Sequence, residues 1–251
     1  MDSKLTNSGL RISGKQLLLL PLVIVLFCTG KAQAQNDVEI YRPYHDNLVY
    51  YFGLTLGYNS SYLHLSKSQK FLQSDSIVVT EPGRSGGIAM ALLATARMND
   101  HFQFRINPGL IIGGAKYISY TLNKPALGET TFQTQTLPST LVTFPFQIKF
   151  NSDRIQNFRT YMMAGLKYDI DLSSNSAARS ADNMVKLGKY DFGYELALGF
   201  NFYLPFVTIS PEIKISNGLT NLLKSDPTLK YSNVFDQILS RMVCFSIHFE
   251  D

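Results

Sequence analysis

Residues 190–204, YDFGYELALGFNFYL, alternate between large apolar or aromatic side chains and residues that are mostly small or polar. The large positions are Tyr190, Phe192, Tyr194, Leu196, Leu198, Phe200, Phe202 and Leu204. A period of two is typical of a β-strand whose two faces meet different surroundings. Fully extended, the stretch would span on the order of 45–50 Å, well beyond a typical globular strand.

The same alternation recurs along most of the chain, and no segment after residue 35 shows a convincing helical period. The pattern predicts eight strands, at residues 50–59, 86–99, 101–120, 141–150, 158–172, 190–204, 206–219 and 237–249. Long polar connections, at residues 65–85, 121–136, 173–186 and 220–236, alternate with short turns at 99–100, 151–157 and 204–205. Long loops on one side and short turns on the other are typical of barrels in the bacterial outer membrane.

Side-chain size indicates which face of these strands points outward. An eight-stranded barrel leaves an interior just wide enough for side chains to fill. The aromatic and branched residues would overfill it, whereas the Gly, Ala, Ser and Thr of the other face would fit. The sequence therefore predicts an all-β fold, an eight-stranded antiparallel up-and-down transmembrane β-barrel with its apolar face toward lipid. A secreted, lipocalin-like barrel is the alternative, since it shares the alternation.

The N-terminus has the features of a secretory signal. Lys4, Arg11 and Lys15 precede the apolar run of residues 17–27, and an Ala-Gln-Ala cleavage site ends at residue 34. We expect a signal peptide at 1–34, a short periplasmic lead at 35–49 and the barrel domain at 50–251. A lipoprotein anchored through Cys28 is the alternative, but bulky Phe27 stands where a small residue is needed.

Charge and cysteine content narrow the function. The full chain carries a net charge of +4, and removal of residues 1–34, with four basic residues and one acidic residue, leaves +1. The sequence therefore gives no argument for nucleic-acid binding. Only Cys244 remains in the mature chain, which excludes an intrachain disulfide.

Charged residues on the strands fall mostly on the inward face. The basic ones are Arg97, Arg105, Lys149, Arg159, Lys167 and Lys214, and the acidic ones are Asp169, Asp171, Asp191, Glu195 and Glu212. This near balance predicts a lumen filled by paired charges, because unpaired buried charge is costly. We expect Lys167 or Lys214 to pair with Asp191 and Glu195. An ion path is the alternative, but aqueous channels need about 16 strands.

Some outward positions suit the membrane interface. Lys116 and Arg241 are expected to face outward near the long loops, where they could reach the interface and meet lipopolysaccharide phosphates. Aromatic residues near strand ends suit interfacial girdles; these are Tyr50, Tyr58, Phe102, Tyr120, Phe150, Phe158, Tyr190 and Phe202. Outer-membrane lipids and lipopolysaccharide are therefore expected partners.

Signs of catalysis are weak. The His64-Leu65-Ser66 stretch is similar to the His-x-Ser pair of outer-membrane lipid A deacylases, but no acidic partner is evident. The other histidines, at positions 45, 101 and 248, show no metal-ligand spacing, and there is no phosphate loop or CxxC. We expect no enzyme, no catalytic or metal site and no cofactor.

Several stretches resemble the PorT (SprT) family of outer-membrane proteins. They are FGLTLGYNSS at 52–61, IKFNSDRIQNFRTYMMAGLKYDIDL at 148–172, KLGKYDFGYELALGFNFYLPFVTISPEIKISNGLTNLL at 186–223 and the final SIHFED. The part from 148 to 223 is the most specific. The resemblance implies an accessory component of the type IX secretion system, required for export of cargo such as gliding-motility adhesins and secreted proteases. Its implied partners are other components of that system.

The C-terminus suits insertion into the outer membrane. Phe245, Ile247 and Phe249 alternate at the end of the last strand and resemble the signal read by the barrel-assembly machinery, although Glu250 and Asp251 follow. Both ends of the mature chain are expected in the periplasm. The fallback function is a general small outer-membrane barrel with a structural or adhesive role.

Overall fold

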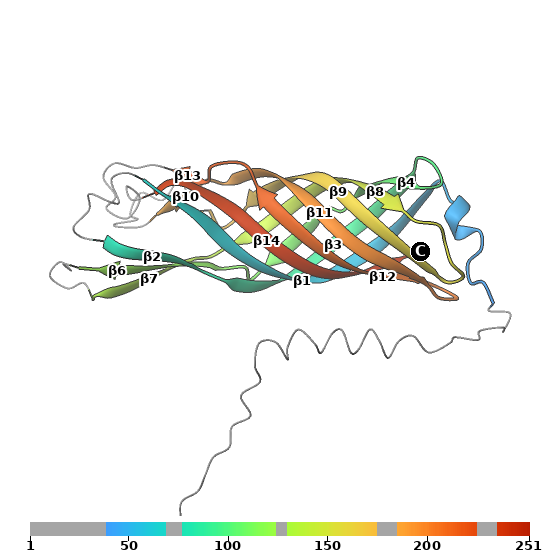
Figure 1. Ribbon diagram of the computed structural model, residues 1–251, viewed down its shortest axis with the longest axis horizontal. Helices are drawn as coiled ribbons and strands as arrows, with labels where there is room; N and C mark the ends of the chain where they lie inside the picture. The colour runs from blue at the N-terminus through green and yellow to red at the C-terminus, as the bar shows by residue number, and fades with distance from the viewer. Residues whose placement is uncertain (1–38, 69–76, 124–129, 175–184, 225–234) are drawn as a thin grey trace, which may run out of the picture. The chain divides into compact units, whose positions relative to one another are not determined.

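A computed structural model describes residues 39–68, 77–123, 130–174, 185–224 and 235–251 (Figure 1). The predicted signal peptide at 1–34 lies outside these residues, as do parts of all four long loops. Within the ranges described, no helix is long and apolar enough to span a bilayer. The helical structure there is η1 (His45–Asn47), a single 3₁₀ turn in the lead.

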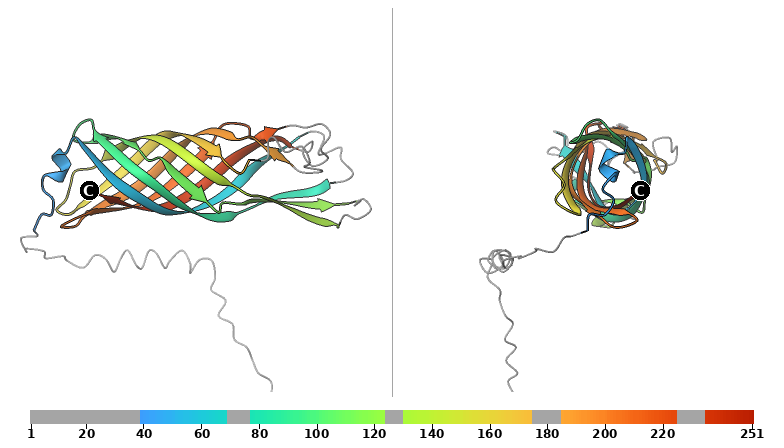
Figure 2. Two further views of the ribbon diagram at one scale, coloured as in Figure 1. Left: turned by 180° about the vertical axis from the view of Figure 1, so that it is seen from behind. Right: turned by 90° about the vertical axis from the view of Figure 1, so that its right-hand side faces the viewer.

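Antiparallel strands close into a ring with eight positions, which confirms the predicted barrel. Two short strands share one position, because both pair with the same neighbours on each side. The positions, in ring order, are β1 (Tyr50–Lys67), β14 (Phe235–Glu250), β12 (Thr208–Gly218), β11 (Tyr190–Tyr203), β9 (Phe158–Asp171), β8 (Thr140–Asn151), β4 (Phe102–Ile106) with β5 (Gly109–Ile112), and β3 (Ser85–Arg97). The first strand, β1, pairs with β14 on one side and with β3 on the other, so the ring is closed and the sheet has no free edge (Figure 2, right).

The barrel is apolar outside and polar inside, as the size argument predicts. The residues of β11 alternate between exposed and buried from Tyr190 to Tyr203, and the large side chains are exposed except for Tyr203 at the short-turn end. Leu196 is 54% exposed, whereas its neighbour Glu195 is 3% exposed. Large apolar side chains on the outside of a barrel need a lipid environment, because water would penalise such a continuous apolar surface.

Small inward residues make room for the few large side chains in the lumen. Gly199 faces inward on β11, and the Tyr161 ring of β9 lies across it. A Cβ atom at position 199 would collide with that ring. The small face of the strand is therefore needed for lumen packing, which is why the large residues alternate to the outside.

Three strands extend the barrel at its long-loop end. They are β2 (Ile77–Gly83), β6 (Lys116–Leu122) and β7 (Phe132–Leu137), paired in the antiparallel order β2-β6-β7 (Figure 1). Two of them, β2 and β7, fall where the sequence predicted loops, and the third, β6, is the end of the predicted strand at 101–120. A short pair, β10 (Lys186–Leu187) with β13 (Leu223–Lys224), lies at the same end. The predicted strand at 101–120 is therefore three strands, interrupted at Asn107-Pro108 and at residues 113–115.

The second interruption makes two predicted orientations wrong. Gly113 has a φ of 89°, and the residues after it restart the alternation with the opposite parity. Lys116, expected to face outward, is 3% exposed, and Tyr120, expected in the interfacial girdle, is 2% exposed. Arg241 does lie on the outward side of β14, between two buried residues, as predicted.

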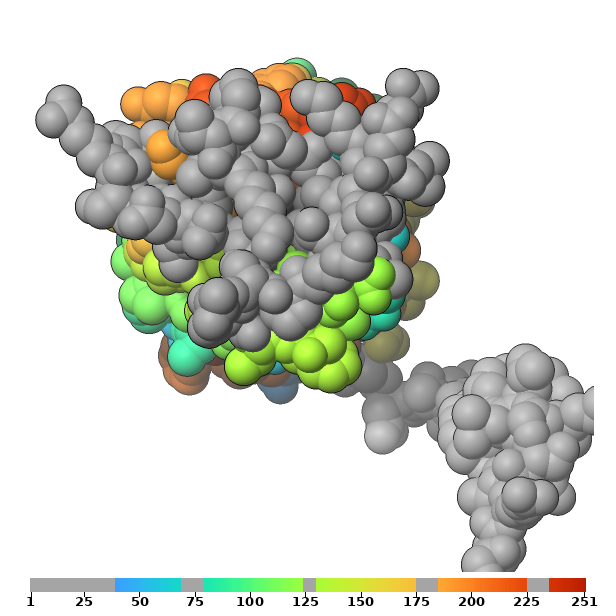
Figure 3. Space-filling model, turned by 90° about the vertical axis from the view of Figure 1, so that its left-hand side faces the viewer, coloured from blue at the N-terminus to red at the C-terminus, as the bar shows by residue number. Residues whose placement is uncertain are grey.

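An apolar cluster lies at the long-loop end, beyond the polar lumen. We call it the loop-end cluster. Buried residues of the extension sheet and of β1, β10 and β14 form most of it, and residues 185 and 222 complete it. Its members are Leu63, Ile118, Tyr120, Leu122, Leu137, Val185, Leu187, Leu222, Phe235 and Ile238. Figure 3 views this end, with the yellow-green β6–β7 residues forming part of its rim.

The opposite end carries the three short turns, at residues 98–101, 152–157 and 204–207. Aromatic rings cluster there on the outside of the barrel. Phe102 and Phe150 have ring centroids 5.1 Å apart, and Phe158 lies 5.6 Å from Phe200 and 5.3 Å from Phe202. Such a belt fits one of the predicted interfacial girdles.

Replacing Leu196 by Arg tests the lipid-facing assignment. Leu196 lies near the middle of β11 on the outer face. We expect Leu196→Arg to lower the free energy of unfolding by about 2–4 kcal/mol, because a charge near the bilayer midplane must leave water. Urea unfolding in phospholipid vesicles measures this. Phe132→Arg is the matched control, since Phe132 is 74% exposed but lies on β7, outside the barrel ring. Equal small effects at both positions would contradict the assignment.

Candidate functional site: the charged lumen and the N-terminal lead

Arg105 is the centre of the lumen network. Its guanidinium is fully buried and donates to two carboxylates from strands on the other side of the ring. Arg105 Nη2 lies 2.6 Å from Glu250 Oε1 on β14, and Nη1 lies 3.3 Å from Glu212 Oε2 on β12. Hydrogen-bonded ion pairs of this kind compensate for the loss of hydration that burial imposes.

Further polar groups contact the same two carboxylates. The Tyr161 hydroxyl donates to Glu212 at 2.9 Å, and a His248 ring nitrogen lies 3.2 Å from the same carboxylate. Lys149 Nζ lies 3.9 Å from Glu250 Oε1 and 3.9 Å from the centroid of the Tyr161 ring. The middle of the lumen is thus a connected network of charged and polar groups from five strand positions, β4, β8, β9, β12 and β14.

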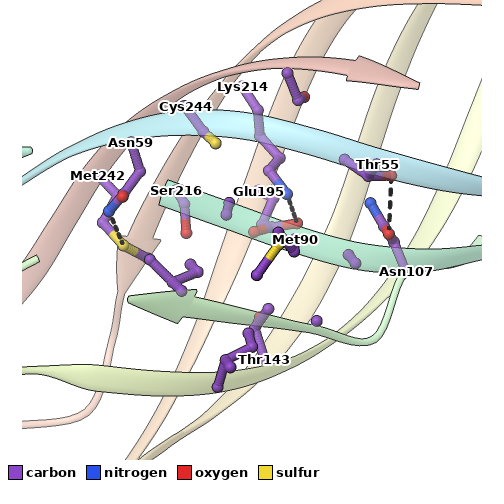
Figure 4. A pocket seen from close by; sticks show the side chains of 16 residues that line it. Thr55, Asn59, Met90, Asn107, Thr143, Glu195, Lys214, Ser216, Met242 and Cys244 are labelled. Carbon is purple, nitrogen blue, oxygen red and sulfur yellow. Dashed lines mark hydrogen bonds and ion pairs between the residues drawn. The ribbon is translucent and has the colours of Figure 1, made fainter. Parts of the chain in front are cut away.

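Nearer the long loops, Glu195 and Lys214 form the predicted ion pair at 3.4 Å (Figure 4). Gln147 donates to the same carboxylate at 2.7 Å. Beside this pair lies a cavity of about 40 Å³, whose polar lining includes Asn59 and Ser216. A cavity of this size has room for ordered water but not for a transported solute.

The prediction that Lys167 or Lys214 forms an ion pair with Asp191 is wrong. Lys167 donates to Asp169 at 2.6 Å on its own strand, whereas Asp191 accepts a hydrogen bond from the Ser240 hydroxyl. The register explains this choice, because Asp191 and Asp169 are direct cross-strand neighbours that share one basic environment.

At the short-turn end, the lead enters the mouth of the barrel (Figure 2, right). Asp46 of η1 accepts a hydrogen bond from Arg154 at 3.1 Å, from Arg159 at 3.1 Å and from the Tyr203 hydroxyl at 2.9 Å. These donors come from the β8–β9 turn and from two barrel strands. One carboxylate therefore fixes the lead to two different parts of the rim.

Other contacts hold residues 39–42 of the lead. Arg42 Nη1 donates to the Glu250 carbonyl at 3.0 Å and to Thr208 at 3.3 Å. Asn157, in the β8–β9 turn, accepts from the Tyr41 amide and donates to the Glu39 carbonyl, both at 2.8 Å. The lead is thus a docked plug and not the free linker that a short polar segment would suggest.

His45 is the part of the lead that reaches the lumen. Its side chain is buried between the rings of Tyr51, at 4.9 Å between centroids, and Tyr203, at 5.8 Å. Its Nδ1 atom has no hydrogen-bond partner in the described part of the chain. Burial, reinforced by the nearby Arg42, lowers the pKa of His45 from 6.5 to about 4.

The sequence analysis does not identify Glu250 and Asp46. It places Glu250 beyond the insertion signal, yet Glu250 is the last residue of β14 and pairs with Arg105. Glu250 continues the series of every second residue, Cys244, Ser246 and His248, that faces the lumen, and this spacing is a signal that places it in the lumen. Asp46 had no such signal, because the lead has no periodicity.

A filled lumen of this kind can stabilise and seal a barrel. Among the described residues, no group of three His, Cys, Asp or Glu side chains could hold a metal ion. His64 of the suggested His-x-Ser pair is exposed on the outward side of β1, away from the lumen charges.

The comparisons with known proteins concern the barrel. A family model described as an outer membrane protein beta-barrel domain matches residues 33–224. No curated protein matches the chain.

Three solved structures are similar to the chain at low identity. Neisserial surface protein A has a TM-score of 0.39 and 12% identity, over 78% of this chain and 95% of that one. OprG from Pseudomonas aeruginosa has a TM-score of 0.45 and 13% identity, over 80% of this chain and 93% of that one. The N-terminal barrel domain of OprF from Pseudomonas aeruginosa has a TM-score of 0.32 and 8% identity, over 78% and 97%.

A double-mutant cycle tests the Arg105–Glu250 pair. We expect Arg105→Met to lower the free energy of unfolding by about 3–5 kcal/mol, because it leaves Glu250 buried without its closest partner. Adding Glu250→Gln should recover part of this loss, since the uncompensated charge is removed. Urea unfolding in vesicles measures both. Strictly additive effects would show that the two groups do not interact.

The docking of the lead should depend on pH through His45. Between pH 6.5 and about 4, His45 is neutral when the lead is docked, because its pKa is lowered there, but it binds a proton when the lead is released. Docking should therefore be strongest above pH 6.5, weaken as the pH falls from 6.5 to about 4, and change no further through His45 below that. A spin label at Tyr44→Cys, in a Cys244→Ser background, reports release as increased mobility, because Tyr44 is 79% exposed. His45→Phe should show no change across this range, and an identical pH response in that control would contradict the assignment.

Proposed function

The chain belongs to the family of outer membrane protein β-barrel domains, and from this premise we propose that it is a non-enzymatic component of the type IX protein secretion system. Its place is the outer membrane, in keeping with its apolar outer surface. In this role it acts through protein contacts that the export of adhesins and secreted proteases requires. Both ends of the mature chain then face the periplasm, together with the short turns and the docked lead.

The filled lumen is the observation that carries the proposal of a contact role. Arg105, Lys149 and Lys167 are each at most 1% exposed, and the lead occupies the mouth at the short-turn end. A folded cargo protein cannot pass through an eight-stranded barrel, and the cavity beside the Glu195–Lys214 pair has a volume of only about 40 Å³. A contribution to secretion must therefore come from the surfaces that the barrel presents on either side of the membrane.

The resemblance to the PorT family supports the choice of secretion system. Its most specific motif, the SDR-x-x-NFR segment at 152–159, supplies Arg154, Asn157 and Arg159, which all bind the lead. The motif thus has a structural role that joins the N-terminus to the rim at the short-turn end. Under the proposal, this rim with its lead is a surface that periplasmic components of the system can contact.

Two other functions make different demands. A general barrel with a structural or adhesive role needs only the stable fold and the exposed long-loop end. A lipid A-modifying enzyme would use the outward His64 with Ser66 and would require an acidic partner on the same face. Arg241 on the outer face suits lipopolysaccharide contact under any of these functions.

A deletion strain tests the secretion role. We expect cargo adhesins and proteases to accumulate in the periplasm, because an accessory component is missing, while an unrelated outer-membrane protein keeps its normal level. Fractionation and immunoblotting measure both, and the full chain supplied on a plasmid should restore secretion. Normal secretion in the deletion strain would overturn the assignment and favour the general barrel.

The same strain separates the enzyme alternative. Mass spectrometry of its lipid A should show the wild-type pattern, whereas an altered pattern that the plasmid restores would favour the enzyme. An epitope tag at residues 127–128, in the loop between β6 and β7, should be labelled by antibody on intact cells. Labelling only after permeabilisation would reverse the proposed orientation.

A further inference from the structure

The extension sheet β2-β6-β7 has two edges, and its hydrogen-bond pattern defines which groups they expose. The Leu122 amide of β6 donates to the Thr131 carbonyl at 2.8 Å, just before β7. In an antiparallel ladder, residue pairs that exchange backbone hydrogen bonds alternate with pairs that do not. Counting from the bonded pair Leu122–Thr131, the next residues of β7 that bond to β6 are Gln133 and Gln135. The N–H and C=O groups of Thr134 and Thr136 therefore point away from β6, toward the free edge.

The β2 edge of the sheet is closed. On its other side, β6 bonds to β2 through the alternate residues, which pair with Val79 and Glu81. The backbone groups of Thr80 and Pro82 therefore point away from β6, toward the outer side of β2. Thr80 is 6% exposed, and proline has no amide hydrogen to donate. Proline at such a position is one of the ways in which proteins prevent a strand edge from pairing.

The β7 edge has neither protection. Thr134 and Thr136 are exposed, and no backbone or side-chain partner for their backbone groups occurs among the residues that the structure describes. The strand, FQTQTL, has no proline and no charged side chain, which are the usual means of blocking an edge. Among the described strands, none pairs with this side of β7, and β8, which follows it in the chain, pairs with β9 only from Leu141 onward.

We propose that the outer edge of β7 binds an extended peptide segment of another protein by strand addition. This goes beyond the proposed secretion role, because it assigns a binding edge at the long-loop end that the secretion argument does not use. The alternating donors and acceptors at Thr134 and Thr136 match a β-strand and no other backbone conformation. The main chain of the bound segment supplies affinity, and its alternate side chains supply specificity.

The surroundings of the edge define the chemistry of the segment. On one face of the sheet, β7 contributes Leu137, which is buried in the loop-end cluster, and on the other face it carries Phe132, which is 74% exposed. Apolar or aromatic side chains of the bound strand can contact Phe132. The absence of charge on β7 favours a segment with little charge of its own, because a buried unpaired charge would be costly.

A second copy of this chain is the less suitable occupant. Figure 1 shows β7 running along the long axis of the barrel. Two copies inserted in one membrane have parallel barrel axes, and therefore parallel β7 strands. Pairing the same edge of both copies in an antiparallel ladder would require them to have opposite orientations in the membrane.

Fluorescence anisotropy with a synthetic probe tests the edge on the full-length mature chain in detergent micelles. The probe is a fluorescein-labelled, end-capped peptide of the β6 sequence YISYTL, whose residues already pair with the other edge of β7 in the fold and carry no charged side chain. A second probe has the same side chains but is methylated on alternate backbone nitrogens. We expect saturable binding of the first probe and at least tenfold weaker binding of the second.

Two substitutions at one position separate backbone from side chain. Thr134→Pro removes an outward N–H without breaking the ladder to β6, so it should weaken binding at least tenfold. Thr134→Ala keeps that N–H and should bind within about twofold of the wild type. Heat-dependent gel mobility checks that each variant retains its barrel. Slower deuterium exchange at the Thr134 and Thr136 amides when the probe is added provides a measurement on the unmodified chain.

The outcomes are decisive in both directions. Loss of binding in Thr134→Pro but not in Thr134→Ala, with protection of both amides, supports strand addition. Equal binding of the methylated probe, equal binding by Thr134→Pro, or no saturable binding by the wild type would overturn it. Dimers that form with rising protein concentration and that Thr134→Pro abolishes would assign the edge to a second copy, and would also overturn the proposal.

Discussion

The pairing of β1 with β3 closes the sheet, and the rest of the structure depends on this closure. A polypeptide can cross lipid as a sheet only if every backbone amide and carbonyl is bonded within the sheet, which requires a ring without edges. With eight positions the ring is narrow, so its inward face must be small, polar or both. The inward glycines, the buried charges and the large outward side chains are all consequences of the same geometric limit.

A narrow lumen lined by charge must also neutralise itself. Arg105 achieves this by reaching across the interior to Glu250 and Glu212, which ties β4 to strands that are distant in sequence. Tyr161 donates a further hydrogen bond to Glu212, and Gln147 donates one to Glu195, and these contacts limit the room for solvent. The barrel is therefore sealed by the interactions that allow its charges to be buried, and its function must be exerted at its two ends.

The sequence was most informative where one physical constraint acts on every residue. The alternation of β11 predicted its faces from Tyr190 to Tyr203, and the pairing of Glu195 with Lys214 followed from lumen parity. Prediction was wrong beyond the ring, where the lipid no longer requires one continuous alternation. There the chain bends at Gly113, the buried positions shift by one residue, and Lys116 faces inward. The lead has no period at all, and only three-dimensional contacts reveal that Asp46 belongs to the rim.

The backbone of the lead indicates that its docked position is specific. Arg42 in the lead and Gln156 in the turn that holds it both have positive φ angles, of 51° and 55°. Residues other than glycine adopt this region at a cost of order 1 kcal/mol or more, so the surrounding contacts must outweigh it. Arg154, whose guanidinium stacks 3.7 Å from the Tyr203 ring while binding Asp46, provides such contacts. A segment that merely followed a signal peptide would need none of these features, so the lead is better understood as an element of the barrel.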